Sequence, residues 1–361
     1  MSRVLMILAG GTGGHVFPGL AVAHYLRDRG WEAVWLGTRH GMEARLVPQH
    51  GIPFDGIRFA SVRGKGVLRL LLGPITIGWA FLQSIALMFR RRPDVVLGMG
   101  GYVSLPSGLA AAFLHRPLAI HDSNAVAGLA NRALARFAAR ICAGFPEAFG
   151  ARFGKKVVLT GNPLRSDIVA VTPPAERFAG RTGPLRLLVV GGSLGAQALN
   201  AVVPQGLALL DGEERPRVTH QAGAQHIDAL LAAYREAGVE AECIAFIDDM
   251  ARRYAECDLI ICRSGALTVS ELAAAGVASI LVPFPGAIAD EQTANARHLA
   301  ERGAALLEPQ SGLSAERLAL LLRSLDRSRL LAMAQAAYAS GQRDATQRVA
   351  QVCEELARSE A

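Results

Sequence analysis

The sequence predicts an α/β protein made of two doubly wound, Rossmann-like parallel-sheet domains. Short apolar runs alternate with helical patterns along most of the 361 residues, which is typical of a parallel sheet. Two such series occur, and each opens with an apolar run that leads into a glycine turn, GGT at 10–12 and GGS at 191–193. A chain of this length is also too long for one ordinary core and fits two domains.

The first series ends near residue 163. A helical pattern, FPGLAVAHYLRDRG, directly follows its first glycine turn. Parallel strands need crossover helices of this kind between them. The apolar runs expected as strands are VLMILA (4–9), EAVWLG (32–37), VVLGMGG (95–101), PLAIHDSN (117–124), RICAGF (140–145) and KVVLTGNP (156–163).

The second series follows PPAERFAGRTGP (173–184), a segment rich in proline, glycine and charge, as expected of an exposed connection. We predict an N-terminal domain over 1–163 and a C-terminal domain over 164–340. The final helix, within 341–361, can pack on either domain, and we place it on the first. The strands expected in the second series are LRLLVVGG (185–192), RVTHQAG (217–223), ECIAFI (242–247), DLIICRSG (258–265) and ASILVPFP (278–285).

Composition indicates a reducing compartment and gives the two halves opposite charge. Five cysteines are an odd number without a Cys-x-x-Cys pair, which argues against a disulfide framework or a zinc site. We expect no signal peptide, because the first apolar run is short and leads straight into glycines. Residues 1–160 carry 19 Lys and Arg against 7 Asp and Glu, a net charge of +12, and the remainder carries −5. The first half should therefore meet an anionic partner or surface. Nucleic acid is not expected, since no helix-turn-helix, RRM or KH pattern occurs.

One apolar stretch, LLLGPITIGWAFLQSIALMF (70–89), has twenty residues without a charge and is followed by Arg90, Arg91 and Arg92. Its length fits a membrane-spanning helix, but its place among alternating strands and helices argues against spanning. Helices that are apolar all round are normally buried, whereas the arginines favour insertion at an anionic membrane surface. We expect surface insertion, with Trp79 or Phe81 as an inserted side chain.

The glycine turns are the strongest sign of ligand binding. Open α/β sheets bind ligands at the carboxyl ends of their strands, where glycine lets a ligand approach the backbone and a helix start offers free N–H groups. One such turn alone can simply connect a strand to a helix, whereas four together favour phosphate binding. The four are GGTGG (10–14), GMGGY (98–102), GGSLGA (191–196) and RSGALTVSE (263–271).

Two common classes of phosphate-binding protein do not fit. A dinucleotide-binding dehydrogenase needs Gly-x-Gly-x-x-Gly, but Val16 stands where the third glycine belongs. A P-loop is absent because no Gly-Lys-Ser/Thr occurs. A sugar-nucleotide transferase remains, and its leaving diphosphate needs stabilisation. The sequence has no Asp-x-Asp for a metal, so helix N-termini and a cation, Arg165 or Arg263, would supply it.

The motifs, taken in their order, resemble those of the MurG family, the UDP-N-acetylglucosamine transferases of peptidoglycan synthesis that convert lipid I to lipid II. The resemblance spans nearly the whole chain. It implies a GT-B fold with two domains facing a cleft, inversion at the anomeric carbon, and no metal or cofactor. It also implies peripheral attachment to the cytoplasmic face of the inner membrane, a role in cell shape and division, and other cell-wall synthesis proteins as partners. The motifs are GGTGGHVFPGLAVA, GMGGYVSLP, NAVAGLANR, GNPLR, GGSLGA, FIDDM, SGALTVSELAAAG and DEQTANA.

The resemblance also implies roles for individual residues. Arg165 and Ser193 would hold the donor pyrophosphate, and the backbone of Ile247 would read uracil. Glu271 would bind the ribose hydroxyls, and Gln292 the GlcNAc hydroxyls. The donor set is Thr12, Gly13, Gly14, Asn124, Arg165, Ser193, Ile247, Ala266, Leu267, Thr268, Val269, Ser270, Glu271 and Gln292. The set for the acceptor, undecaprenyl-pyrophosphoryl-MurNAc-pentapeptide, is Gly100, Gly101, Tyr102 and His121, together with the basic, apolar surface near 67–92.

The chain departs from the family pattern at two positions within these motifs. Asp122 stands where the family commonly has glutamate, and Leu194 stands where it commonly has glutamine. Asp122 is the shorter acid, and the side chain of Leu194 cannot form hydrogen bonds. Neither position is therefore assigned a direct role in binding.

His15 is the predicted general base, because it follows the glycines of the first turn. An imidazole with an ordinary pKa of about 6.5 suits removal of the proton from the acceptor's C4 hydroxyl. His121 and Asp122 are the alternatives. Glu271 is expected in the first turn of a helix, where an acid is also favoured locally.

Two other functions stay open. One is a different UDP-sugar enzyme of the same fold, such as a glycolipid transferase or a non-hydrolysing epimerase. The other is a non-catalytic, membrane-docked binding protein, which would keep the glycines but would not need His15 or Arg165. Release of UDP that depends on the acceptor separates the transferase from both.

Overall fold

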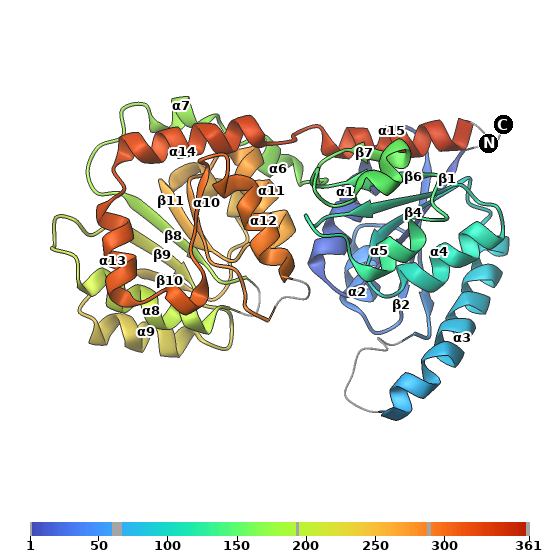
Figure 1. Cartoon of the computed structure of the whole chain (residues 1–361), viewed down its shortest axis with the longest axis horizontal. Helices are drawn as coiled ribbons and strands as arrows, with labels where there is room; N and C mark the ends of the chain where they lie inside the picture. Colours follow the sequence, from blue (N-terminus) through green and yellow to red (C-terminus); the bar gives the residue numbers. More distant parts are fainter. Residues whose placement is uncertain (1, 60–66, 193–194, 287–289, 359–361) are drawn as a thin grey trace. The chain divides into compact units, whose positions relative to one another are not determined.

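The computed structural model describes residues 2–59, 67–192, 195–286 and 290–358, without the side chains of 67–72 and 151–152. The chain divides into two compact units, Met1–Arg165 with Arg343–Ala361, and Ser166–Gln342 (Figure 1). The first unit contains β1 (Val4–Ala9), α1 (Gly13–Arg27), β2 (Glu32–Thr38), α2 (Met42–Gln49), β3 (Phe54–Ile57), α3 (Val67–Arg91), β4 (Val95–Gly100), α4 (Ser104–Phe113), β5 (Leu118–Asp122), α5 (Leu129–Leu134), β6 (Arg140–Ala143), η1 (Ala151–Lys156), β7 (Val157–Leu159) and α15 (Ala345–Arg358).

The sheet of the first unit has the strand order β3-β2-β1-β4-β5-β6-β7, and all its pairs are parallel. The chain order reverses direction between β1 and β4, which makes this the switch point where open sheets bind ligands. The turns 10–14 and 98–102 follow these two strands. The fold therefore places both glycine turns of the first unit beside each other.

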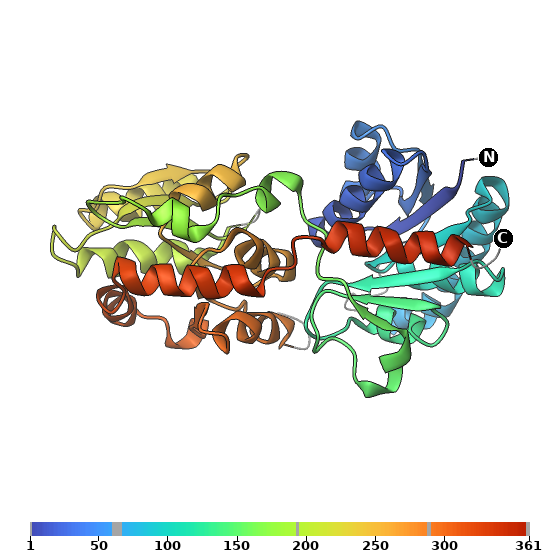
Figure 2. The same ribbon diagram turned by 90° about the horizontal axis from the view of Figure 1, so that it is seen from above.

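Helices cover both faces of this sheet, which explains why its strands read as unbroken apolar runs. Leu5 and Ile7 of β1 face α1 and α15, while Met6 and Leu8 face α3, α4 and α5. All four of these side chains are fully buried. The C-terminal helix α15 belongs to the first unit, and Figure 2 shows it lying across that unit's sheet. The helix contributes Val349, Ala350, Val352, Cys353, Leu356 and Ala357 to the core beside α1.

The second unit repeats the plan with a parallel sheet of order β10-β9-β8-β11-β12-β13. Its switch point lies between β8 and β11, where the two other glycine turns follow their strands. Its elements are α6 (Ser166–Val169), α7 (Pro174–Phe178), β8 (Arg186–Val190), α8 (Gln197–Ala208), β9 (Arg217–Gln221), α9 (Ile227–Glu236), β10 (Glu242–Ile244), α10 (Met250–Glu256), β11 (Leu259–Cys262), α11 (Ala266–Ala275), β12 (Ser279–Leu281), α12 (Glu291–Ala300), β13 (Ala305–Leu307), η3 (Gln310–Gly312), α13 (Ala315–Arg323) and α14 (Arg327–Ser340).

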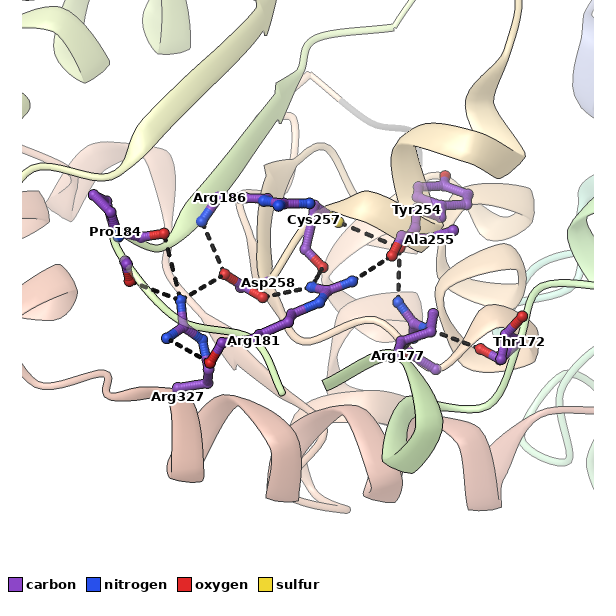
Figure 3. Close-up of polar contacts among 12 residues, drawn as sticks. Thr172, Arg177, Arg181, Pro184, Arg186, Tyr254, Ala255, Cys257, Asp258 and Arg327 are labelled. Atoms are coloured by element: carbon purple, nitrogen blue, oxygen red, sulfur yellow. Dashed lines mark hydrogen bonds and ion pairs between the residues drawn. The ribbon is translucent and has the colours of Figure 1, made fainter. Parts of the chain in front are cut away.

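The polar connection 173–184 is fastened to the second unit by arginines (Figure 3). Asp258, which is 1% exposed, accepts hydrogen bonds from Arg181 Nη1 (2.5 Å) and from the backbone of Arg186 (2.9 Å). Arg177 donates from Nη1 to the carbonyl of Tyr254 at the end of α10 (2.8 Å), and from Nη2 to Ala275 at the end of α11 (2.9 Å). The connection thus satisfies terminal carbonyls of α10 and α11, the two helices on either side of β11 in the chain.

Candidate active site

The glycine turns of the first unit pack directly against each other. Gly101 has a φ of +83°, and a Cβ there would lie 2.2 Å from the carbonyl oxygen of Gly10. Gly100 has a φ of +105°, and a Cβ there would lie 2.7 Å from the ring of His15. Side chains are therefore excluded at both positions by backbone conformation and by space. The structure brings together the predicted residues Thr12, Gly13, Gly14, His15, Gly100, Gly101 and Tyr102.

The imidazole of His15 is held by its Nδ1 atom. Nδ1 lies 3.3 Å from the Gly10 carbonyl oxygen and 3.3 Å from the Thr12 hydroxyl. Because a carbonyl only accepts hydrogen bonds, we assign the proton of the neutral ring to Nδ1. This leaves the lone pair on Nε2, beside Gly100, available to accept a proton.

The surroundings of His15 favour its neutral form. Burial lowers the pKa of His15 below its ordinary value of 6.5, and this effect exceeds the opposing effects of the Asp122 charge, the Gly10 carbonyl and the Glu43 charge. At neutral pH the imidazole is therefore a free base. That is the state required of a group that must take a proton from a hydroxyl.

Glu43 supports the first glycine turn. None of the sequence motifs had indicated a role for this residue. Its side chain is fully buried at the start of α2 and accepts from the Thr38 backbone (3.0 Å), the Thr38 hydroxyl (2.7 Å) and the Gly11 backbone (3.2 Å). A Cβ at Gly10 would lie 2.4 Å from its Oε1. The only sequence signal for it was an acid in a first helical turn, which is common for local reasons.

His121 and Asp122 are the last two residues of β5, and both are buried. His121 is fully buried, and its Nε2 donates to the carbonyl of Gly161 over 3.1 Å. Asp122 is 4% exposed and accepts from the backbone of Asn124 (3.1 Å) and of Gly128 (2.8 Å), and from the side chain of Asn131 (3.0 Å). Both shape the loop that carries Asn124. We therefore leave His121 out of the proposed acceptor site and give Asp122 a positioning role.

In the second unit, the start of α11 offers free backbone donors at the switch point. The residue before its first turn, Gly265, has no side chain to cap the helix, and Ala266 to Val269 form that turn. After β8, Gly195 has a φ of +75°, and a Cβ there would lie 2.1 Å from the Ala222 carbonyl oxygen. Ser193 and Leu194 lie outside the described residues.

Glu271 lies in the second turn of α11, because the helix begins at Ala266. The expectation of a first-turn position was wrong, and the interaction of an acid with the helix dipole does not account for this residue. Its Oε2 accepts a 3.0 Å hydrogen bond from the hydroxyl of Tyr254 on α10. The carboxylate is half-buried and oriented by a neighbouring helix.

Gln292 and Ile247 are also placed by hydrogen bonds around them. The Oε1 of Gln292 accepts from the backbone of Phe284 over 2.9 Å, which turns the amide so that its NH2 group can donate elsewhere. Gln221 donates to the carbonyls of Gly192 (3.0 Å) and Ala245 (3.1 Å) and so ties the third glycine turn to the loop that carries Ile247. The motifs did not identify Gln221.

Of the two arginines considered for the diphosphate, Arg263 is half-buried and Arg165 is exposed. Arg263 holds two segments of the second unit together. Its Nη1 donates to the carbonyls of Val282 (3.1 Å) and Pro283 (3.2 Å), and its Nη2 donates to Gln310 (2.6 Å). Burial lowers its pKa. We therefore assign Arg263 to the fold and keep the exposed Arg165 as the candidate cation.

Comparisons with known proteins agree with this architecture. The N-terminal domain of glycosyltransferase family 28 matches residues 5–143, and its C-terminal domain matches residues 186–349. The crystal structure of MurG from Acinetobacter baumannii superposes with a TM-score of 0.85 at 42% identity, covering 98% of this chain and 99% of that one. The predicted GT-B fold with two Rossmann-like domains is confirmed. A UDP-N-acetylglucosamine 2-epimerase, at 14% identity and a TM-score of 0.63, shares the fold alone.

Curated relatives match over nearly their full length. A UDP-N-acetylglucosamine–N-acetylmuramyl-(pentapeptide) pyrophosphoryl-undecaprenol N-acetylglucosamine transferase from Aromatoleum aromaticum is 59% identical over 355 residues, 98% of each chain. Its namesake from Dechloromonas aromatica is 54% identical over 358 residues, 99% of this chain and all of that one. The protein therefore belongs to glycosyltransferase family 28 and, within it, to the MurG family.

Proposed function

We propose that the protein transfers GlcNAc from UDP-GlcNAc to the C4 hydroxyl of MurNAc in undecaprenyl-pyrophosphoryl-MurNAc-pentapeptide, with inversion at the anomeric carbon. The 59% identity to a transferase named for these substrates, over nearly the full chain, carries the proposal. The arrangement of His15 supports it, because Nε2 is a free base beside two packed glycine turns.

In this mechanism, Nε2 of His15 takes the proton of the C4 hydroxyl while the hydroxyl oxygen attacks the anomeric carbon of GlcNAc. The bond from that carbon to the β-phosphate oxygen breaks, and UDP leaves with the electron pair. The N-termini of α8 and α11 and the guanidinium of Arg165 stabilise the charge that develops on the diphosphate. A charge-assisted hydrogen bond from arginine contributes about 1.5–3 kcal/mol. The proposed reaction needs no metal or other cofactor, and turnover should survive excess EDTA.

The donor site of the proposal is built mainly from the second unit. Glu271 takes the ribose hydroxyls, the backbone of Ile247 takes uracil, and the NH2 of Gln292 donates to the GlcNAc hydroxyls. The backbone of α11 from Ala266 to Ser270 lies along the nucleotide. The first unit supplies the acceptor side, from Gly100, Gly101 and Tyr102, together with Thr12, Gly13, Gly14 and Asn124 toward the donor sugar.

We also propose that α3 attaches the protein to the cytoplasmic face of the inner membrane, where the lipid-linked acceptor lies. The helix exposes large apolar side chains at helical spacing, namely Ile75 (67% exposed), Trp79 (58%), Leu82 (56%) and Phe89 (64%). Exposed apolar side chains aligned on one helix face suit a membrane interface. Within the described residues, no helix is long and apolar enough to cross a bilayer.

Three residues of the predicted membrane contact have partners within the first unit. Arg90 and Arg91 both form ion pairs with Asp55, which is 7% exposed, so these arginines hold α3 to β3. Phe81 is half-buried, and its ring packs edge-on against that of Phe113, with 5.8 Å between ring centroids. The apolar side chains on the exposed face, with Trp79 among them, are therefore the better probes of attachment.

UDP release from UDP-GlcNAc, measured with and without a lipid-linked MurNAc-pentapeptide, tests the proposed function. Release that requires the acceptor supports transfer. Release without any acceptor, or conversion of the donor to its epimer, would favour the epimerase alternative. Binding of the donor without turnover in either condition would favour a binding protein.

A further inference from the structure

A pocket of about 780 Å³ lies at the carboxyl ends of β2 and β3, one strand beyond the first glycine turn. Of the residues that line it, the proposed acceptor site uses only Tyr102. Two arginines, a histidine and two aromatic side chains line it. These residues are Arg39, His40, Arg58, Phe59 and Tyr102, with Thr38 and Ile57 at the strand ends.

The pocket shares a wall with the candidate active site. Tyr102 lines the pocket, and a Cβ at Gly11 in the first glycine turn would lie 3.4 Å from its ring. The Thr38 hydroxyl lies 3.5 Å from the Tyr102 hydroxyl and donates to Glu43, which also accepts from the backbone of Gly11. A group bound in the pocket could therefore belong to the same molecule as a sugar bound at the glycine turns.

The pocket is basic, and hydrogen bonds fix the side chain of Arg39 and the backbone of Arg58. The Nε of Arg39 donates to the carbonyl of Gly56 over 3.1 Å. Gln83 on α3 bonds both backbone groups of Arg58, accepting from its N–H (2.9 Å) and donating to its carbonyl (3.4 Å). The side chains of Arg39 and Arg58 are exposed, and none of the lining residues that the structure describes is acidic. The pocket should therefore favour an anion.

The size and lining of the pocket indicate more than an inorganic anion. Pockets of about 300–1,000 Å³ with aromatic walls and a few convergent polar groups suit organic ligands of moderate size. The rings of Phe59 and Tyr102 lie 5.8 Å apart and provide such walls. A diphosphate is smaller than such ligands. The N-terminus of α1 at Gly13, outside the lining of this pocket, offers a diphosphate backbone N–H donors. A short peptide with carboxylates matches both the apolar and the basic parts of the pocket.

We propose that this pocket binds the peptide stem of the acceptor, with peptide carboxylates on Arg39 and Arg58. The planar guanidinium pairs with a carboxylate through two parallel hydrogen bonds. This inference rests on the proposed function, which supplies a pentapeptide on the sugar whose hydroxyl reacts. The pocket would then select acceptors by their peptide.

The test compares KM for three soluble, short-chain versions of the acceptor: one with the pentapeptide, one with every peptide carboxylate amidated, and one without the peptide. Arg58→Ala should raise KM for the first about tenfold and leave the other two nearly unchanged. Arg45→Ala is the matched control, since Arg45 is an exposed arginine on α2 outside the pocket. The Arg45→Ala variant should leave KM unchanged for all three acceptors. Arg58→Gln, which keeps most of the side-chain length, carries the same test if the alanine variant does not fold.

Three results would overturn the inference. An equal rise in KM for the peptide-free acceptor would assign the pocket to the diphosphate. An equal rise for the amidated acceptor would exclude carboxylate recognition. An unchanged KM for all three would exclude the pocket from acceptor binding. Each of these results requires that the parent protein turns over the pentapeptide acceptor, so a failure of the proposed function would be seen separately as no turnover by the parent.

Discussion

The hydroxyl of Tyr254 donates a 3.0 Å hydrogen bond to Oε2 of Glu271, joining α10 to α11 beside the second switch point. Tyr254 is 2% exposed, and burial raises its pKa well above the ordinary value, so the hydroxyl remains a donor at any working pH. Arg177 bonds the carbonyl of Tyr254 (Figure 3). Arg177 also bonds the carbonyl of Ala275 at the end of α11. This contact orients the carboxylate that we assign to the donor ribose.

Tyr254→Phe should therefore raise KM for UDP-GlcNAc about threefold to tenfold, because the carboxylate loses a partner that holds its orientation. KM for the acceptor should stay unchanged. Tyr234→Phe is the matched control, since Tyr234 is 3% exposed in the same unit and its hydroxyl lies 2.9 Å from Nδ1 of His220. Steady-state kinetics check both variants. An equal rise in donor KM for the two would mean that Tyr254 acts only through stability.

Glu271→Ala should have a larger effect on the same parameter. Two hydrogen bonds from ribose hydroxyls to a carboxylate contribute about 1.5–3 kcal/mol each before water compensates. KM for UDP-GlcNAc should rise at least about tenfold, while KM for the acceptor changes little. A change confined to the acceptor KM would mean that Glu271 acts on acceptor binding and not on donor binding.

His15→Ala should lower kcat by about 10²–10⁴, the usual range for loss of a general base, with little change in UDP affinity. The pH profile provides a second readout. Since the base must be neutral, activity should fall as pH drops through the pKa of His15, which burial lowers below 6.5. The acid limb should therefore lie below pH 6.5. His24→Ala, which changes another histidine of α1, is the control and should leave kcat unchanged. Equal losses of UDP binding and turnover in His15→Ala would indicate a residue that only shapes the pocket.

Trp79→Ser combined with Leu82→Ser should weaken binding to vesicles that contain anionic lipid. Full burial of a large apolar side chain contributes about 1.5–3 kcal/mol, so loss of two should reduce binding at least about tenfold. Turnover on a short-chain soluble acceptor should persist. Leu320→Ser is the control, because Leu320 is 60% exposed in the second unit. Vesicle sedimentation measures the effect, and parent-like binding by the double variant would place attachment elsewhere.

Asp258→Ala should destabilise the second unit by about 3–5 kcal/mol, because it leaves Arg181 without its buried partner. Asp344→Ala removes the exposed partner of Arg348, 2.7 Å away, and should cost about 0–1 kcal/mol. Denaturant unfolding compares the two. Similar losses would show that the network around Asp258 contributes no more than a surface pair.

The sequence predicted the elements that carry long apolar runs or glycine turns. It missed β3 and β13, which have four and three residues and lie at the edges of their sheets, where short strands carry little pattern. Periodicity and turn chemistry act locally, so they predict such elements directly. The pairing of turns 10–14 and 98–102 depends on strand order, which the sequence did not reveal. The close approach of Gly101 to Gly10 explains why glycine is required there.

Residues that act through distant contacts escaped prediction. Glu43 holds Gly11 across 32 positions, and Gln221 holds Gly192 across 29. Neither pairing leaves a local pattern. The partners of Arg263 were hidden for the same reason, since they lie 19 to 47 positions away. A basic residue near a glycine turn does not reveal which carbonyls it will meet.

The most direct test of the proposed transfer is NMR analysis of the product formed from UDP-GlcNAc labelled with ¹³C at the anomeric carbon and the lipid-linked MurNAc-pentapeptide, with EDTA present. We predict a β-linked GlcNAc on the C4 oxygen of MurNAc, formed by the parent and lost in His15→Ala. An α-linkage, attachment at another hydroxyl, an epimerised donor, or a product that forms only after a divalent metal is added would contradict the account.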